Sequence, residues 1–223
     1  MGVLMAQEEA FEAVVCGGGP AGLAAGIELA SLGFRTVVLE KRKSFEEVER
    51  TKAFHYLVDQ RGQKWTARHG LTELLKERGV PADGLKLTKL FPDGTAKTSP
   101  MPIASPGGVW IPRKQVLAVL AEKARQTPLL ELRCGATASI DVRDDRCAVR
   151  VDDDDRSYDL RPRLLVGCDG IGSPTRETTV DQKLIKLPSP SAGLLYKVLT
   201  ISATAEGISD PDMTYTVPSA LTS

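Results

Sequence analysis

The stretch Val14–Gly22, VVCGGGPAG, decides the fold of this chain. It contains the pattern G-x-G-x-x-G at Gly17, Gly19 and Gly22. In this pattern the first glycine permits a sharp turn, the second lets the backbone approach a pyrophosphate, and the third lets a helix pack closely on a strand. A helix that begins directly after such a turn offers free N–H groups and the positive end of its dipole to phosphates. The stretch therefore predicts a nucleotide-binding turn between a strand and a helix.

The segments on both sides supply this strand and this helix. Phe11–Cys16 is an apolar run typical of a buried strand, and Pro20–Leu32 has the apolar density of a buried helix. Gly33 fits the C-terminal cap of that helix. A second apolar run, residues 36–39, ends at Glu40. Strand, glycine turn, helix and strand form one βαβ unit with parallel strands, so we predict an α/β, Rossmann-like domain.

Glu40 ends the second predicted strand at about the spacing, roughly 20 residues, that a ribose-binding acid has after the glycine turn. A carboxylate there accepts both ribose hydroxyls and repels a 2′-phosphate. Arg42 follows two residues later. These features fit NAD as well as FAD, and the cofactor site predicted here consists of Gly17, Gly19, Pro20, Ala21, Gly22, Glu40 and Arg42.

The composition excludes several other classes of function. Lys+Arg and Asp+Glu number 29 each, which gives a formal net charge of +0 and argues against a nucleic-acid surface. The four cysteines form no Cys-x-x-Cys pair and have no histidine cluster beside them, so we expect no metal site but free thiols in a reducing compartment. No apolar run approaches the roughly 18 residues of a membrane span, and no secretory signal is visible. We therefore expect a cytoplasmic or other reducing intracellular location without a membrane segment.

The middle of the chain reads as a mixture of elements. We predict a strand at Ala53–Val58, a helical stretch over Trp65–Leu75, and a loop-and-strand insertion rich in Pro and Gly at residues 79–108. A helix over Lys114–Gln126 follows Ile111-Pro112-Arg113.

From Leu129 apolar residues alternate with polar ones, which predicts a β-meander. The acids at residues 144–145 and 152–155 fit solvated hairpin tips, and the chain returns along Leu164–Val166. A last strand-like run covers residues 194–202.

A second glycine tip distinguishes the two candidate cofactors. The returning strand ends in Gly167-Cys168-Asp169-Gly170, after which Ser173-Pro174 is typical of a helix start. Arg113 and Lys114 stand at another predicted helix N-terminus, where cations meet the unfavourable end of the dipole unless an anion binds there. An exposed cation pair without a ligand is the alternative. A plain NAD-dependent dehydrogenase needs neither feature, so they favour FAD.

In this order the motifs resemble the single-component, FAD-dependent aromatic hydroxylases. The motifs are Gly17-x-Gly19-x-x-Gly22, Glu40-x-Arg42, Arg113 with Leu117, and Gly167-Cys168-Asp169-Gly170-x-x-Ser173-x-x-Arg176. The resemblance covers roughly Phe11 to Arg176, and residues 53–71 are most similar to the kynurenine 3-monooxygenase branch. It implies a glutathione-reductase-like FAD-binding domain with a β-meander crossover, interrupted by pieces of an incomplete substrate domain.

The resemblance also implies roles for single residues. Glu40 would hold the adenosine ribose, and Arg42 and Arg113 would contact FAD. Leu57 would contact the flavin, and the Asp169-Gly170 tip would serve both the FAD pyrophosphate and the reduced nicotinamide. NADPH or NADH would reduce the flavin, O₂ would add to form a flavin C4a-hydroperoxide, and its oxygen would pass to a small aromatic or related organic substrate. The cofactor carries this chemistry, so no catalytic acid–base pair is expected.

The resemblance predicts a domain division as well. Residues 1–180 would form the FAD-binding domain, with 79–108 as a substrate-domain insertion, and residues 181–223 would begin a truncated substrate domain. Two departures stand out. The kynurenine branch binds its substrate carboxylate with an Arg and a Tyr, but residues 79–108 contain neither, so kynurenine is not the expected substrate. The family's later Gly-Asp motif has no counterpart here. The alternatives are an FAD- or nucleotide-binding module without turnover, and an NAD(P)-dependent dehydrogenase.

Overall fold

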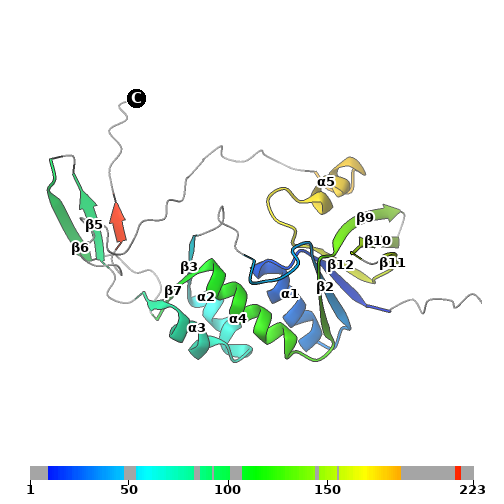
Figure 1. Cartoon of the computed structure of the whole chain (residues 1–223), viewed down its shortest axis with the longest axis horizontal. Helices are drawn as coiled ribbons and strands as arrows, with labels where there is room; N and C mark the ends of the chain where they lie inside the picture. Colours follow the sequence, from blue (N-terminus) through cyan, green and yellow to red (C-terminus); the bar gives the residue numbers. More distant parts are fainter. Residues whose placement is uncertain are drawn as a thin grey trace, which may run out of the picture. The chain divides into compact units, whose positions relative to one another are not determined.

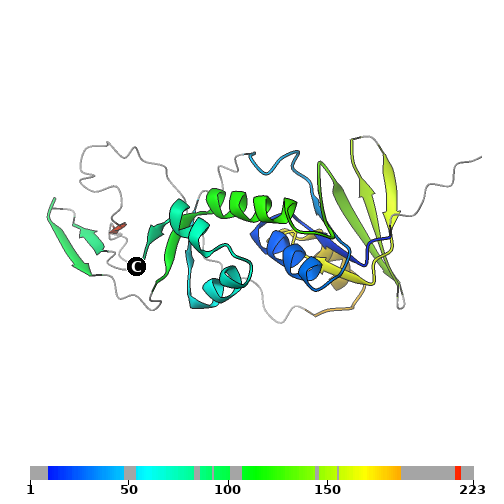
Figure 2. The same ribbon diagram turned by 90° about the horizontal axis from the view of Figure 1, so that it is seen from below.

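The computed structural model describes residues 10–47, 54–82, 86–91, 93–100, 107–143, 146–154, 156–186 and 214–216 (Figures 1 and 2). The chain divides into two compact units. The first consists of residues 1–48 and 117–195, and the second of residues 49–116 and 196–223.

A four-stranded parallel sheet forms the centre of the first unit. It has the order β12-β1-β2-β8, with β1 at Ala13–Cys16, β2 at Thr36–Glu40, β8 at Leu130–Cys134 and β12 at Leu164–Gly167. Helix α1, Pro20–Ser31, connects β1 to β2. The predicted βαβ unit and α/β fold are therefore confirmed. The prediction that the meander begins at Leu129 is wrong for its first strand, because Leu130–Cys134 pairs in parallel with β2.

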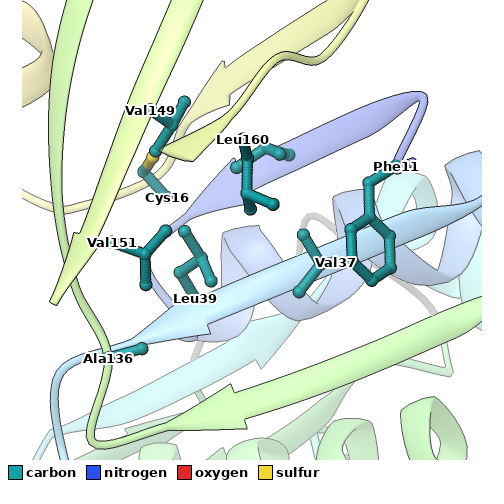
Figure 3. Packing of buried hydrophobic residues seen from close by; sticks show 9 residues of the cluster. Phe11, Cys16, Val37, Leu39, Ala136, Val149, Val151 and Leu160 are labelled. Atoms are coloured by element: carbon teal, nitrogen blue, oxygen red, sulfur yellow. The ribbon is translucent and has the colours of Figure 1, made fainter. Parts of the chain in front are cut away.

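The meander itself comprises three antiparallel strands in the order β11-β10-β9. They are β9 at Thr137–Arg143, β10 at Arg146–Asp152 and β11 at Ser157–Leu160. Figure 3 shows buried side chains of β1 and β2 pointing toward side chains of the meander. This core contains Phe11, Val14, Cys16, Val37, Leu39, Ala136, Val149, Val151 and Leu160. Every residue of β1 and β2 is buried, as expected for parallel strands covered on both faces.

Helix α5, Pro174–Asp181, follows β12 and begins where the sequence predicts it. Its N-cap is Ser173, whose hydroxyl accepts a hydrogen bond from the N–H of Arg176 at 3.0 Å. Pro174 occupies the first helical position, where a missing N–H costs nothing.

The second unit contains two small sheets. In the first, β7 at Val109–Pro112 lies between β3 at His55–Val58 and β4 at Val80–Pro81, all antiparallel. In the second, β5 at Lys86–Leu90 pairs with β6 at Ala96–Pro100 and with β13 at Thr214–Thr216. The predicted insertion at residues 79–108 thus contains three strands within its described part.

The helices of this unit differ from the single stretch that the sequence predicts. Trp65–Leu75 is divided between α2 at Gln60–Arg68 and α3 at Thr72–Arg78. Asp59 caps α2 by accepting hydrogen bonds from the N–H groups of Arg61 and Gly62. Helix α4, Arg113–Arg125, begins in the second unit and ends in the first.

Some sequence predictions cannot be compared with the structure. Residues 144–145, 155 and the run at 194–202 lie outside the described residues. The functional division at residue 180 stays a prediction. In the described part of the chain, no helix is both long and apolar enough to cross a membrane.

Candidate functional site

The two glycine tips, at residues 17–22 and 167–170, are far apart in the sequence but meet where the parallel strands β1 and β12 end. Gly17 has a φ of +102°, and a Cβ atom there would lie 2.4 Å from the carbonyl oxygen of Cys168 and 2.8 Å from the Cα of Asp169. The N–H of Cys168 donates to the carbonyl of Cys16 at 2.7 Å. Residue 17 must therefore be glycine, because both its backbone conformation and its neighbour exclude a side chain.

Gly22 is surrounded closely by other atoms, whereas Gly19 has open space beside it. A Cβ at Gly22 would lie 1.8 Å from the carbonyl oxygen of Gly17, so the turn closes only without a side chain there. A Cβ at Gly19 would meet nothing within 4 Å. Gly19 is the N-cap of α1, Pro20 follows at its start, and no described side chain caps this end. The first-turn N–H groups, including that of Ala21, thus remain available to an anion.

Close packing of α1 on the sheet depends on Gly26, which the sequence analysis missed. A Cβ at Gly26 would lie 2.6 Å from Cγ2 of Val38 and 3.1 Å from Cδ1 of Leu130. Gly26 therefore continues, one helical turn later, the close helix–strand contact that Gly22 permits. The spacing of four residues between the two glycines was the available signal, since such residues lie on one helix face.

Glu40 ends β2 beside the glycine turn, and its side chain is 7% exposed. Its Oε2 accepts from the N–H of Gly18 at 2.9 Å, and its Oε1 accepts from the N–H and Nε of Arg42 at 2.9 and 3.0 Å. Burial disfavours the charge, but the hydrogen bonds from Arg42, its positive charge and the Gly18 N–H outweigh it and lower the pKa of Glu40. The structure thus places an ionised carboxylate next to the turn.

Asp169 directs its carboxylate toward helix α5. Its Oδ1 accepts from the hydroxyl of Ser173, and its Oδ2 accepts from the N–H of Thr175 at 2.9 Å. Burial is again outweighed, here by hydrogen bonds from Ser173 and Thr175, so the pKa of Asp169 is lowered. Asp169 therefore fixes the start of α5 against the strand tip.

The backbone around Asp169 also depends on small residues. A Cβ at Gly167 would lie 2.8 Å from Cγ2 of Thr175, so the first residues of α5 lie directly against the end of β12. Beyond Asp169, Gly170 has a φ of +91°, and Ile171 is 92% exposed. The guanidinium of Arg176 donates to the carbonyl of Ile171.

The remaining predicted site residues, Leu57 and Arg113, belong to the second unit. Leu57 lies on β3 opposite Trp110 and is 38% exposed. Arg113 is the first residue of α4, as predicted, and is buried; its N–H donates to the carbonyl of Phe54 at 2.9 Å. The structure thus brings the turn, Glu40, Arg42 and the Asp169-Gly170 tip together within one unit, and it describes Leu57 and Arg113 within the other.

The described cysteine and histidine residues do not form a further catalytic or metal site. The four cysteines are free, and burial, together with the charge of Asp169, raises the pKa of the Cys16 thiol to about 12. His69 lies against the ring of Trp65, with ring centroids 4.4 Å apart. No group of three His, Cys, Asp or Glu residues that could hold a metal ion occurs in the part of the chain that the structure describes.

Comparison with known proteins gives a consistent result. A family model described as an FAD binding domain matches residues 10–215. A rifampicin monooxygenase of Streptomyces venezuelae is 34% identical over 171 residues, which cover 75% of this chain and 33% of that protein. The chain therefore spans about a third of the length of the curated relative that it matches.

Several solved structures share the fold of this chain. The flavin-dependent monooxygenase PieE, in complex with FAD and substrate, is 21% identical with a TM-score of 0.67, over 78% of this chain and 33% of that chain. An anhydrotetracycline hydroxylase of Streptomyces rimosus is 26% identical with a TM-score of 0.58, over 77% of this chain and 34% of that chain.

Proposed function

The chain belongs to the family described as the FAD binding domain, and on that premise we propose that it binds FAD as the cofactor-binding part of a single-component, FAD-dependent monooxygenase. The observation that carries the proposal is the meeting of the Gly17 turn with the Cys168–Asp169 tip at one sheet edge. Glu40 stands ionised beside the same turn. The reductant would be NADPH or NADH, the oxidant O₂, and the substrate a small aromatic or related organic molecule.

The residues present fit the adenosine diphosphate half of FAD. The space beside Gly19 is open, and the uncapped start of α1 offers N–H groups and a positive dipole end to the pyrophosphate. A ribose hydroxyl would donate to the Glu40 carboxylate and share it with Arg42. The Asp169-Gly170 backbone would form the neighbouring wall. That Leu57 and Arg113 contact the cofactor stays a prediction.

When bound, the flavin supplies the redox chemistry between reduced nicotinamide and O₂. The chain's own part is to bind and orient. The positive end of the α1 dipole would attract the negative charge of the FAD pyrophosphate. Asp169 fixes the tip next to the turn through its hydrogen bonds with Ser173 and Thr175. The kynurenine-type branch stays a prediction, and the names of the relatives extend the candidate substrates to rifamycin and tetracycline types.

The proposal is tested first by cofactor binding. The purified chain should show flavin absorbance or take up added FAD, and a protein that binds NAD⁺ but not FAD would refute it. Glu40→Gln should weaken FAD binding, because the neutral amide is a poorer acceptor for ribose hydroxyls. Glu46→Gln is the matched control, since its side chain is 72% exposed and bonds Ser44 at the surface.

Turnover is tested separately. NADPH and NADH oxidation is measured with and without kynurenine, a rifamycin and a tetracycline, in this chain and in a longer form of it. Substrate-stimulated oxidation with a hydroxylated product supports the monooxygenase assignment. Tight FAD binding without turnover in either form would instead favour a binding module.

A further inference from the structure

Gly18, the middle residue of the three consecutive glycines, is held on both sides. Its N–H donates to Oε2 of Glu40 at 2.9 Å, and its carbonyl accepts from Nη2 of Arg42 at 3.4 Å. A Cβ at Gly18 would lie 2.8 Å from Cβ of Glu40 and 2.9 Å from the ring of Phe45. The peptides on both sides of Gly18 therefore have defined orientations in the protein without a ligand.

The side chain that holds the Gly18 carbonyl is itself fixed. The Nε and Nη2 atoms of Arg42 lie 3.0 and 3.2 Å from the two carboxylate oxygens of Glu40, and the Arg42 side chain is 10% exposed. Its guanidinium lies 5.9 Å from the ring centroid of Phe45, which is buried. Its backbone carbonyl accepts from the N–H of Gly135 at 2.8 Å. Arg42 is thus anchored through its backbone, its charge and its aromatic contact.

The orientation of the Gly18 carbonyl also fixes the next N–H. In a trans peptide the C=O of one residue and the N–H of the next point in opposite directions. Because the Gly18 carbonyl points toward Arg42, the N–H of Gly19 points away from it. Gly19 is the residue with open space beside it, where a phosphate would approach.

We propose that Arg42 is a positioning residue, which acts through Glu40 and Gly18 to orient the Gly19 N–H toward the cofactor phosphate. Phe45, which carries no sequence motif, supports both the guanidinium and the Gly18 backbone. The role of Arg42 toward the cofactor rests on the proposed FAD binding, whereas its contacts with Glu40 and Gly18 are present without a ligand.

Three variants test it. Arg42→Met removes the charge and the side-chain hydrogen bonds to Glu40 and to the Gly18 carbonyl. Arg42→Lys keeps the charge but not the paired contact with the carboxylate. Lys43→Met is the matched control, because it removes a cation one residue away, where Nζ binds Asp154 at 2.8 Å and the side chain is 77% exposed.

The first measurement is hydrogen exchange of the Gly18 N–H in the protein without FAD. We expect Arg42→Met to exchange about tenfold faster than the parent, since the Glu40 acceptor is no longer held in place. Arg42→Lys should be intermediate, and Lys43→Met should match the parent.

The second measurement is the FAD dissociation constant between pH 5 and pH 8. The parent should be nearly constant, because its lowered pKa keeps Glu40 ionised throughout. Arg42→Met should bind about tenfold more weakly at pH 8, as one charge-assisted bond is worth about that factor. It should weaken further toward pH 5, since the pKa of Glu40 rises when its partner is lost.

Other charged groups near Glu40 do not produce this pH dependence. The Cys134 thiol on β8 interacts with Glu40, but burial and the Glu40 charge raise its pKa, so it stays neutral over this range. Arg125, whose guanidinium also lies over the ring of Phe45, pairs with Glu46 at 3.5 Å. Arg42→Lys should therefore retain the flat profile of the parent at an intermediate affinity.

The outcomes separate the two claims. If the parent fails to bind FAD, the proposed function fails, while the exchange of the Gly18 N–H still decides the positioning role. Unchanged exchange in Arg42→Met would overturn that role. Weaker binding by Arg42→Met with a flat pH profile would overturn it too, because that result indicates direct contact between Arg42 and the cofactor. If Arg42→Met does not fold, Arg42→Lys is decisive: exchange and affinity equal to the parent would overturn the proposal.

Discussion

Replacing Gly19 by alanine should weaken cofactor binding more than tenfold while leaving the fold intact. Gly19 has φ −72° and ψ 178°, a conformation that alanine adopts without strain, and its Cβ would meet no atom within 4 Å. Alanine gains up to about 1 kcal/mol from a less flexible unfolded chain. It loses a few tenths as a poorer N-cap. The free energy of unfolding should therefore change by less than about 1 kcal/mol.

The effect on FAD should be much larger. A methyl group at residue 19 would occupy the side from which the pyrophosphate must approach the first-turn N–H groups. We expect FAD affinity to fall by more than tenfold, about 1.4 kcal/mol or more. Urea unfolding and quenching of flavin fluorescence measure the two quantities on the same sample.

Gly22→Ala is the informative contrast. Its Cβ would lie 1.8 Å from the Gly17 carbonyl oxygen, so the turn itself must move, and the cost should reach about 3 kcal/mol of unfolding free energy. Gly172→Ala, which would meet nothing within 4 Å, serves as the neutral control. If Gly19→Ala destabilises the protein as much as Gly22→Ala, or binds FAD like the parent, the separation between fold and cofactor space is wrong.

The remaining predictions concern packing and titration. Gly26→Ala should lower the free energy of unfolding by about 1–3 kcal/mol in urea titrations, because its Cβ would lie 2.6 Å from Val38; a change as small as that of Gly172→Ala would contradict this. Asp169 has a lowered pKa, so it contributes stability above its unfolded pKa, near 4, and loses it as the pH falls through the folded value. Asp169→Asn should therefore reduce the loss of stability on acidification, and an unchanged slope would show that the α5 cap is not linked to this titration. Cys16, with its thiol pKa raised to about 12, should resist iodoacetamide at pH 8 in the folded chain and react only after unfolding, as followed by mass spectrometry; rapid labelling of the native protein would contradict its burial.

The sequence was sufficient where local and global signals agree. The βαβ unit and the helix after Ser173 follow from apolar runs bounded by glycine and proline, and both are confirmed. The failures have physical causes. β8 lies at the edge of the sheet and is only half covered, so its residues alternate like those of an antiparallel strand. The division of the helical stretch between α2 and α3 lies at Gly70, which has a φ of +70°, and no proline accompanies it.

The candidate site shows the same limit. The spacing of Gly17, Gly19 and Gly22 is a local pattern and could be read directly. Phe45 acts through Gly18, which is far away in the sequence, so no local pattern marks it. Gly26 packs against the distant Val38, and its spacing of four residues from Gly22 is its one local signal. The position of Asp169 between glycines marks it as a candidate in the sequence. The direction of its carboxylate depends on where α5 begins, which the sequence around Asp169 does not specify.

These contacts explain why an acid stands at the tip of β12. Gly17 lets the first turn approach the backbone of Cys168, and Gly167 lets Thr175 approach the end of the strand. The two glycines permit these close approaches, and the segment around Asp169 must also be held in place. The Asp169 carboxylate does this, since it binds the Ser173 hydroxyl and the Thr175 N–H and so ties the start of α5 to the tip. A turn without a carboxylate would leave α5 without this anchor. The Cys168–Asp169 tip, which faces the Gly17 turn, would then lose its fixed position.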